Sequence, residues 1–169
     1  SSNPYALEDI VDPSQELIAK SGQNITYTSL NKVKTISEGN YFFTFWYGPN
    51  NERVKMQVKY NGIEEYTVYY FGSHEIVEPY MGSQINIYYL SGPNGVIGME
   101  RDNQIYFFLK DHLGSIMTIA DADGDAVEFL SYDAWGRERN ANDWTYSNAS
   151  SSAFTNRGYT GHEHIDEFG

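Results

Sequence analysis

The sequence predicts an all-β protein, because its composition and the spacing of its apolar runs both favour strands. Aromatic residues make up 16% of the 169 residues, with 15 Tyr and 9 Phe, and the chain has 15 Gly but 5 Pro. Tyr and Phe suit a pleated, half-buried surface, and Gly supplies turns. From Ile25 onward, short runs of β-branched and aromatic residues recur without a long helical pattern between them. An antiparallel meander is therefore expected rather than βαβ units.

Eight strands are predicted from these runs, over residues 25–27, 41–47, 54–60, 66–71, 85–90, 105–109, 116–119 and 127–132. The run 54–60 alternates strictly between apolar and polar residues, which indicates one face in the core and one in water. Residues 1–24 form a less regular N-terminal segment. There Asp12 as N-cap and Pro13 at the first helical position predict one or two helical turns.

A degenerate repeat runs along the chain. Tyr is followed four positions later by Asn or Gly in three segments, as Tyr27 by Asn31, Tyr47 by Asn51 and Tyr132 by Gly136. The spacing holds more loosely through Tyr69, Tyr89 and Asp111. Because Asn and Gly adopt the left-handed conformation most readily, each copy is expected to place a tight turn at this fourth position. We interpret these segments as copies of one hairpin unit.

A further hairpin turn is predicted at Asp123-Gly124, which separates the apolar runs 116–119 and 127–132. Gly reaches positive φ without a Cβ clash, and Asp tolerates the same region. We therefore expect Gly124 at positive φ.

The charge of the chain excludes several partners. The formal net charge is −12, from 23 acidic and 11 basic residues, and no segment gathers enough Lys and Arg to follow a phosphate backbone. Nucleic acid and anionic membrane surfaces are therefore poor partners, and no apolar run reaches the roughly 20 residues that span a bilayer. The absence of Cys excludes disulfides and thiolate metal sites. The first residues lack the basic and apolar regions of a signal peptide.

Three separated motifs carry a family resemblance. They are Asp111-His112-Leu113-Gly114-Ser115, then Tyr132-Asp133-Ala134-Trp135-Gly136-Arg137, then Arg157-Gly158-Tyr159-Thr160-Gly161-His162-Glu163. In this order they resemble the Rhs-repeat-associated core of Rhs/YD-repeat proteins. The YD repeat is named for a Tyr-Asp start followed by Gly-Arg, and residues 132–137 keep that pattern intact, whereas the earlier copies have lost Asp or Gly.

The resemblance implies a division of the chain and a function. Residues 25–139 would be the last YD-type repeats, including the core motifs, and residues 140–169 a loop and the start of the core-closing segment. Within the latter, residues 140–154 are predicted to form a long surface loop pinned by Trp144 and Phe154. The hairpins would stack edge to edge into a curved open sheet, a segment of a hollow Rhs shell.

In the family, such shells enclose a C-terminal polymorphic domain, often a toxin, in secreted or cell-surface proteins. The resemblance therefore implies a non-catalytic structural fragment that helps to encapsulate and deliver a toxin-like domain. Its partners would be further repeats of the parent chain and that C-terminal domain. The self-cleaving aspartyl segment of some members would lie beyond Gly169. We accordingly expect no enzyme activity and no cofactor.

A hydrolase triad is the first alternative, since Asp111, His112 and Ser115 lie within five positions. Adjacent side chains of an extended chain point to opposite faces, so Asp111 cannot easily orient His112 while His112 activates Ser115. A turn in which Asp111 and Ser115 bond to backbone amides and Gly114 relieves a strained φ is the favoured interpretation.

Metal binding is the second alternative. The segment 121–125 resembles the start of a calcium loop, but its Gly is fourth rather than sixth, and Tyr132 stands where a bidentate Glu is needed. A solvated turn is therefore expected. Near the end, His162 and His164 would share a strand face, but no third ligand is placed, although Asp166 and Glu167 follow. The resemblance instead makes the Gly-His-Glu motif structural.

The many tyrosines admit two uses. Aromatic rings can stack on the C–H faces of sugars, which would make the chain a carbohydrate- or cell-surface-binding module. They can also pair across strands, each pair adding roughly 0.2–1 kcal/mol, and this use is favoured. Exposed rings would favour sugar, and buried rings the cross-strand ladder.

Two cations in the motifs are expected to hold the repeats in register. Arg137 and Arg157 are predicted to be partly buried, with their guanidinium groups bonded to carboxylates or carbonyls. Asp133 and Glu163 are the leading candidate partners.

Overall fold

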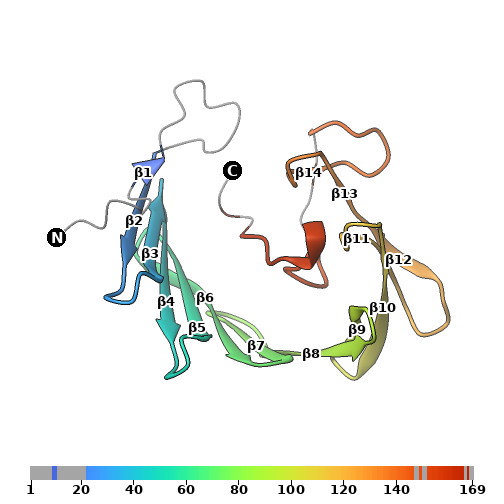
Figure 1. Cartoon of the computed structure of the whole chain (residues 1–169), viewed down its shortest axis with the longest axis horizontal. Coiled ribbons are helices and arrows are strands. Elements are labelled where there is room, and N and C mark those ends of the chain that lie inside the picture. Colours follow the sequence, from blue (N-terminus) through green and yellow to red (C-terminus); the bar gives the residue numbers. More distant parts are fainter. Residues whose placement is uncertain (1–8, 11–21, 147–148, 150–151, 166, 168–169) are drawn as a thin grey trace. The chain divides into compact units, whose positions relative to one another are not determined.

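The computed structural model describes residues 9–10, 22–146, 149, 152–165 and 167, and it confirms the all-β prediction (Figure 1). Within these residues the chain forms fourteen strands and one short 3-10 turn. No helix in this described part is long and apolar enough to cross a membrane. The predicted helical turns at Asp12 and Pro13 lie outside the described residues.

Two compact units divide the chain, namely Ser1–Asn86 with Glu167–Gly169, and Ile87–Asp166. The first contains β1 (Asp9–Ile10), β2 (Gln23–Tyr27), β3 (Val33–Glu38), β4 (Tyr41–Tyr47), β5 (Arg53–Tyr60), β6 (Ile63–Phe71) and β7 (His74–Pro79), and β8 (Ile85–Gly92) begins there. The second continues with β9 (Gly95–Arg101), β10 (Gln104–Lys110), β11 (Ile116–Ala120), β12 (Ala126–Phe129), β13 (Ser131–Tyr132), β14 (Glu138–Arg139) and the 3-10 turn η1 (Tyr159–Gly161).

Neighbouring strands follow chain order from β1 to β12, and β13 pairs separately with β14. The strand pairs with a resolved register are all antiparallel. The order has two ends, β1 and β12, so the sheet is not closed on itself. The predicted open antiparallel meander is therefore confirmed.

The core of the first unit lies on one face of β4, β5 and β6. Phe43 pairs with Val58, and Met56 with Val68, and each of these side chains is at most 1% exposed. The intervening residues of β5, Lys55 and Gln57, lie on the opposite face, as the alternation in residues 54–60 predicts. Replacing Phe43 by Ala would lower the free energy of unfolding by about 3–5 kcal/mol, because it leaves a cavity in this core.

The second unit has its own core, in which Met99, Ile116 and Ile119 are fully or almost fully buried. Gly98 in β9 is required here by close packing. A Cβ at this position would lie 2.2 Å from the carbonyl oxygen of Tyr106 on the paired strand β10. Any side chain at residue 98 would therefore push β9 away from β10.

The sequence did not predict strands β3, β7 and β9. Strand β3 alternates polar residues with Val33 and Ile36, β7 contains His74 and two Glu before Pro79, and β9 contains two Gly. In each strand the β-branched residues are few and are interrupted or flanked by Lys, Glu, Pro or Gly, so they form no clear apolar run, and pairing with neighbouring strands determines the conformation. The predicted strand 127–132 is also interrupted at Leu130 into β12 and β13.

One five-residue turn recurs six times among the described residues. In each copy the first amide donates to the fifth carbonyl and the fourth amide donates to the first carbonyl, with N···O distances of 2.8–3.2 Å. The copies start at Thr28, Gly48, Asp111, Asp121, Asp133 and Gly158. Their fourth residues, Asn31, Asn51, Gly114, Gly124, Gly136 and Gly161, have φ between 59° and 92°. The left-handed position predicted at Asn31, Asn51 and Gly136 is confirmed.

Gly124 also has the predicted positive φ, at 89°. The hairpin turn spans Asp121 to Asp125, the segment predicted to form a solvated turn, and the backbone amide and carbonyl groups of these two residues close it. The Asp121 side chain makes this turn favourable, since its Oδ1 accepts from the amides of Asp123 and Asp125 at 3.0 and 2.9 Å.

Candidate functional site

The aspartates of the first two motifs organise the turns in which they lie. Asp111 Oδ1 accepts hydrogen bonds from the amides of Leu113 and Ser115 at 2.9 and 2.8 Å. Asp133 Oδ1 does the same for Trp135 and Arg137, at 2.8 and 3.0 Å. A short carboxylate reaches amides two and four positions ahead without a change of backbone direction. Each aspartate therefore fixes its own turn.

These hydrogen bonds lower the pKa of both carboxyl groups. Burial alone would raise the pKa of Asp111, but the amides of Ser115 and Leu113 outweigh it and lower the pKa below the ordinary 3.8. At Asp133 burial again opposes the shift, while the Trp135 amide, the Tyr146 hydroxyl and the Arg137 amide lower the pKa. Both side chains therefore serve as anionic acceptors.

The third motif packs onto the turn of the first. Ser115 is fully buried, and its Oγ accepts a hydrogen bond from the amide of Thr160 at 3.1 Å. One residue further on, the amide of Ile116 donates to the carbonyl of Gly158 at 3.1 Å. The polypeptide backbone of residues 158–160 is thereby tied to the start of β11.

The third motif also packs onto the turn of the second. The Tyr159 ring lies against Gly136, where a Cβ would be 2.6 Å from Tyr159 Cδ1, and the Tyr159 hydroxyl donates to the carbonyl of Ala134 at 3.1 Å. Gly158 covers Tyr132, whose hydroxyl oxygen would be 2.5 Å from a Cβ at residue 158. Glycine is thus needed at both positions, because any side chain would keep the Tyr159 ring away from residue 136 and the Tyr132 ring away from residue 158. We call the residues 111–115, 132–137 and 157–163 the motif cluster.

His164 closes one side of the motif cluster. Its Nε2 accepts a hydrogen bond from the amide of Tyr159 at 3.0 Å, its Nδ1 lies 3.8 Å from Glu138 Oε1, and its ring centroid is 5.5 Å from that of Tyr132. Arg157 and Glu163 face each other in an isolated antiparallel bridge. The backbone of the third motif therefore folds back on itself around Tyr159.

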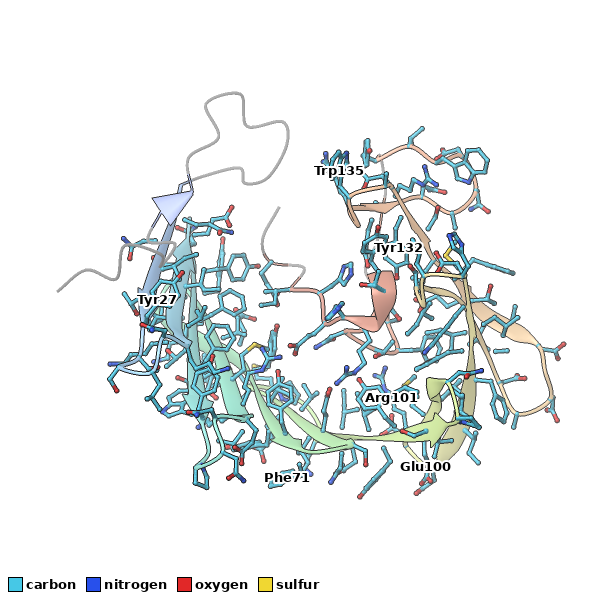
Figure 2. All side chains as sticks on the ribbon, viewed as in Figure 1. Tyr27, Phe71, Glu100, Arg101, Tyr132 and Trp135 are labelled. Carbon is cyan, nitrogen blue, oxygen red and sulfur yellow. The ribbon has the colours of Figure 1, made fainter. Side chains whose placement is uncertain are left out.

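The closing segment, residues 152–164, crosses the meander of the second unit. Its contacts reach β8 through Thr155 Oγ1 and Tyr89 Oη at 3.1 Å, and β10 through the rings of Phe154 and Tyr106 at 4.9 Å. Arg101 of β9 bonds to the carbonyl of Ala153, and Figure 2 labels this arginine. The segment is thus held by side chains from several strands.

Glu128 of β12 also holds the closing segment. Its Oε1 accepts from the amide of Ala153 at 2.9 Å, and its Oε2 bonds to the hydroxyl of Ser152. The predicted anchor Phe154 is confirmed by its contact with Tyr106. The predicted anchor Trp144 is 68% exposed, and its ring lies 5.4 Å from the Arg139 guanidinium. Tyr146 is a further anchor, since its hydroxyl donates to Asp133 Oδ2 at 2.9 Å.

Asp111 and Ser115 of the triad alternative both stabilise their own turn. Asp111 accepts from the amides of Leu113 and Ser115 and from the Ser115 side chain. Buried Ser115 also accepts from the Thr160 amide, while His112 is exposed. Leu113, beside His112 in the same turn, is 54% exposed. Trp135, in the corresponding turn of the second motif, is 92% exposed and is labelled in Figure 2.

Among the described residues, no group of three His, Asp or Glu side chains could hold a metal ion. His162 is exposed, whereas His164 bonds to Tyr159. Glu167 accepts from the hydroxyl of Tyr66 at 2.6 Å within the first unit. Asp166 lies outside the described residues.

The two arginines of the motifs differ from each other. Arg157 is half-buried as predicted, and its guanidinium lies 4.4 Å from the centre of the Tyr89 ring. Arg137 is exposed, so the prediction of partial burial is wrong for it. Its guanidinium lies 4.2 Å from the Tyr146 ring, and its backbone amide donates to Asp133 Oδ1 at 3.0 Å.

The aromatic residues fall into two populations. Phe43, Phe45 and Tyr89 are buried, and rings also pair across strands, as for Tyr41 and Tyr60 at 4.9 Å. Others remain exposed on the opposite face of the first unit, namely Phe42 at 42%, Trp46 at 39% and Phe71 at 60%. Lys55 Nζ lies there between two rings, 4.9 Å from Trp46 and 5.3 Å from Tyr69.

These features define an all-β hairpin-repeat protein whose C-terminal motifs close onto its last strands. No protein-family model and no curated protein matches the sequence. Solved structures do match. A crystal structure of TcdB2-TccC3-Cdc42 aligns with a TM-score of 0.63 and 13% identity, over 83% of this chain and 8% of that one.

Two further structures agree. The Tc holotoxin pore of Photorhabdus luminescens gives a TM-score of 0.63 at 14% identity, and TcdB2-TccC3 without its hypervariable C-terminal region gives 0.62 at 14%. Each covers 83% of this chain, which spans 8% of the matched chain. The matched chains are Rhs/YD-repeat shell proteins, so the fold of this chain is Rhs-like.

Proposed function

We propose that this chain is a non-catalytic piece of an Rhs-type shell that encloses a further polypeptide. The observation that supports this most directly is the motif cluster, in which three separated motifs lock the closing segment across the last strands. A wall built from repeats gains rigidity from such a closure, because each repeat otherwise contacts only its neighbours. The Rhs-like fold supports the same role.

The partners in this proposal are further repeats of a longer parent chain and a C-terminal, toxin-like domain held by the shell. Delivery of that domain by a secreted or cell-surface protein is part of the same proposal. The motif residues then act structurally, by fixing turns and close backbone contacts.

Limited proteolysis of the parent protein tests the enclosure. The domain that follows the shell should be digested much more slowly in the intact parent than as an isolated domain. A Gly136→Phe variant, which places a large ring where Tyr159 packs, should speed its digestion, whereas Gly124→Phe in a turn without such a contact should change it less. Equal digestion rates for the enclosed and isolated domains would contradict the proposal.

The absence of catalysis is tested on the 169-residue chain itself. We expect no turnover of esterase, protease or glycosidase substrates, with or without divalent metals. A His112→Ala variant is the control, because His112 is the general base that a triad would require. Turnover by the parent chain that this substitution abolishes would restore the enzyme interpretation.

A carbohydrate- or cell-surface-binding module is the second candidate, favoured by the exposed rings of Phe42, Trp46 and Phe71. Flat exposed rings can stack on sugars, and neighbouring Lys55 would add polar contacts. Glycan-array binding that is lost in Trp46→Ala but kept in Trp135→Ala would support it. Trp135 is the matched control because it is 92% exposed yet lies in a turn of the other unit. Binding unaffected by Trp46→Ala would contradict it.

A further inference from the structure

A small pocket lies beside the hairpin that β13 and β14 form in the second unit. It has a volume of about 250 Å³ and is lined by residues 127–131 and 138–142. Pockets of roughly 300–1,000 Å³ hold drug-sized molecules, so this one suits a smaller molecule or the end of a chain. The pocket borders the motif cluster but shares no residue with it, so the structural role of the motifs leaves it unused.

Arg139 is the cation in the pocket lining, and two contacts fix its guanidinium group. Its Nε donates to the hydroxyl of Ser131, a buried lining residue, at 2.9 Å. Its Cζ lies 5.4 Å from the centre of the Trp144 ring. A planar guanidinium held in this way keeps its two terminal NH2 groups in a fixed fork. Within the described part of the chain, neither terminal group has a hydrogen-bond or carboxylate partner.

The two glutamates of the lining are engaged elsewhere. Successive side chains of a strand point to opposite faces, so Glu138 points away from Arg139. Accordingly, Glu138 Oε1 lies 3.8 Å from His164 Nδ1. Glu128 uses both of its carboxylate oxygens to hold the closing segment. Neither carboxylate therefore neutralises Arg139 by direct contact, although both line the pocket and would repel a multiply charged anion.

The chemistry of the lining selects a class of ligand. A fixed guanidinium fork matches the two oxygens of a carboxylate. The two glutamates and the net charge of −12 favour a monoanion over phosphate, which carries roughly two negative charges at neutral pH. Val127 and Phe129, which are 40% and 65% exposed, add apolar surface to the lining.

We propose that this pocket binds a small carboxylate that carries an apolar group, with its two oxygens bonded to the terminal NH2 groups of Arg139. The apolar group packs on Val127 and Phe129. A short branched-chain acid and the C-terminal residue of a peptide offer the same chemistry, and they are distinguished by experiment. The site does not depend on enclosure of a further domain, so either proposal can fail without the other.

Binding is measured by NMR titration of the isotope-labelled 169-residue chain with 4-methylpentanoate, and 4-methylpentanamide is the uncharged control. The Nε signal of Arg139 and the amide signals of residues 127–131 should shift with the acid, with a Kd on the order of 1 mM. The amide should bind at least about 10-fold more weakly. Equal binding of the acid and the amide, or no shift at about 10 mM acid, would overturn the proposal.

Three variants separate the guanidinium fork from positive charge alone. Arg139→Lys keeps the charge and should weaken binding about 3- to 10-fold, and Arg139→Gln should weaken it by at least about 10-fold. Arg137→Gln is the matched control, because it removes a neighbouring cation outside the lining and should change the Kd less than about twofold. Unchanged amide signals of β9 and β10 establish that each variant is folded. A loss in Arg137→Gln as large as that in Arg139→Gln would overturn the site.

A peptide identifies the source of the carboxylate. Acetyl-Gly-Gly-Leu with a free carboxyl terminus is compared with the same peptide as its C-terminal amide. If the free peptide binds as tightly as 4-methylpentanoate, the ligand is a chain terminus, and if it binds much more weakly, the ligand is a free small acid. Both results support the carboxylate site, whereas a preference for the peptide amide would contradict it.

Discussion

The hydroxyl oxygen of Ser115 accepts a hydrogen bond from the backbone amide of Thr160 at 3.1 Å, although 45 residues separate them. Ser115 is fully buried, so water cannot replace it as the acceptor. Ser115→Ala should therefore lower the free energy of unfolding by about 1–2 kcal/mol. Urea denaturation measures this loss.

The matched control for Ser115→Ala is Ser131→Ala, which removes another buried hydroxyl that accepts from Arg139 Nε at 2.9 Å. Hydrogen exchange at Thr160 should accelerate in Ser115→Ala and stay unchanged in Ser131→Ala. Equal exchange in both variants would show that Ser115 does not anchor the closing segment.

A pair of glycine substitutions separates backbone strain from packing. Gly124 and Gly136 both have φ of 89°, but a Cβ at residue 124 meets nothing within 4 Å, whereas one at residue 136 would lie 2.6 Å from the Tyr159 ring. Gly124→Ala should lower the free energy of unfolding by about 1 kcal/mol, because Ala is strained at this positive φ. Gly136→Ala should lower it by roughly 1–3 kcal/mol more, because its Cβ also clashes with the Tyr159 ring. Similar melting temperatures for the two variants would contradict the packing of Tyr159 on Gly136.

Acid should loosen the motif turns. The pKa of Asp111 and of Asp133 is lower in the folded protein than the ordinary 3.8, so the unfolded state binds more protons near that pH. The stability they contribute is fully present above pH 3.8, decreases as the pH falls through this value, and is lost below the folded pKa. Denaturant unfolding measured between pH 6 and pH 2 should show this decrease.

Asp111→Asn is the control for the acid effect, because it keeps an Oδ1 acceptor for the amides of Leu113 and Ser115 but no longer titrates. Its free energy of unfolding should depend less steeply on pH below 4 than that of the parent chain. An identical pH dependence in the two proteins would assign the acid effect to other groups.

Arginine-to-lysine substitutions should differ at the two motif positions. Arg157 is half-buried with its guanidinium 4.4 Å from the Tyr89 ring, whereas Arg137 is exposed beside Tyr146. Replacing the flat guanidinium that packs on a partly desolvated ring should lower the free energy of unfolding by about 1 kcal/mol at Arg157. At Arg137 the decrease should be less than about 0.5 kcal/mol. Thermal unfolding compares the two, and a larger loss at Arg137 would reverse this ranking.

The fold class and most strands could be predicted from the sequence because β-branched and aromatic runs carry their own strand preference. Strand β7 could not, since its β-branched pair Ile76-Val77 is flanked by glutamates and by Pro79 and is too short a run, and its conformation depends on pairing with β6. The turn over residues 121–125 was predictable from its Asp and Gly residues. What the sequence did not show is that the Asp121 carboxylate accepts hydrogen bonds from the amides of both Asp123 and Asp125.

The candidate site was predictable as three motifs but not as one cluster. Nothing in the spacing of Ser115, Gly136 and Tyr159 shows that the Tyr159 ring rests on Gly136 while the next amide reaches Ser115. Such contacts depend on how the closing segment returns across the sheet. The exposure of Arg137 was missed for the same reason, because Tyr146 reaches the second motif from a loop without regular structure.

The recurring five-residue turn bears on how such a chain can diverge. Its first residue is Thr, Gly or Asp in different copies, and its fourth is Asn or Gly, yet the same two backbone hydrogen bonds form. Only the fourth residue of the turn is thus restricted to Asn or Gly, and the residue types at the other four positions can change. Very different sequences can therefore share this backbone fold, in keeping with a TM-score of 0.63 at 13% identity.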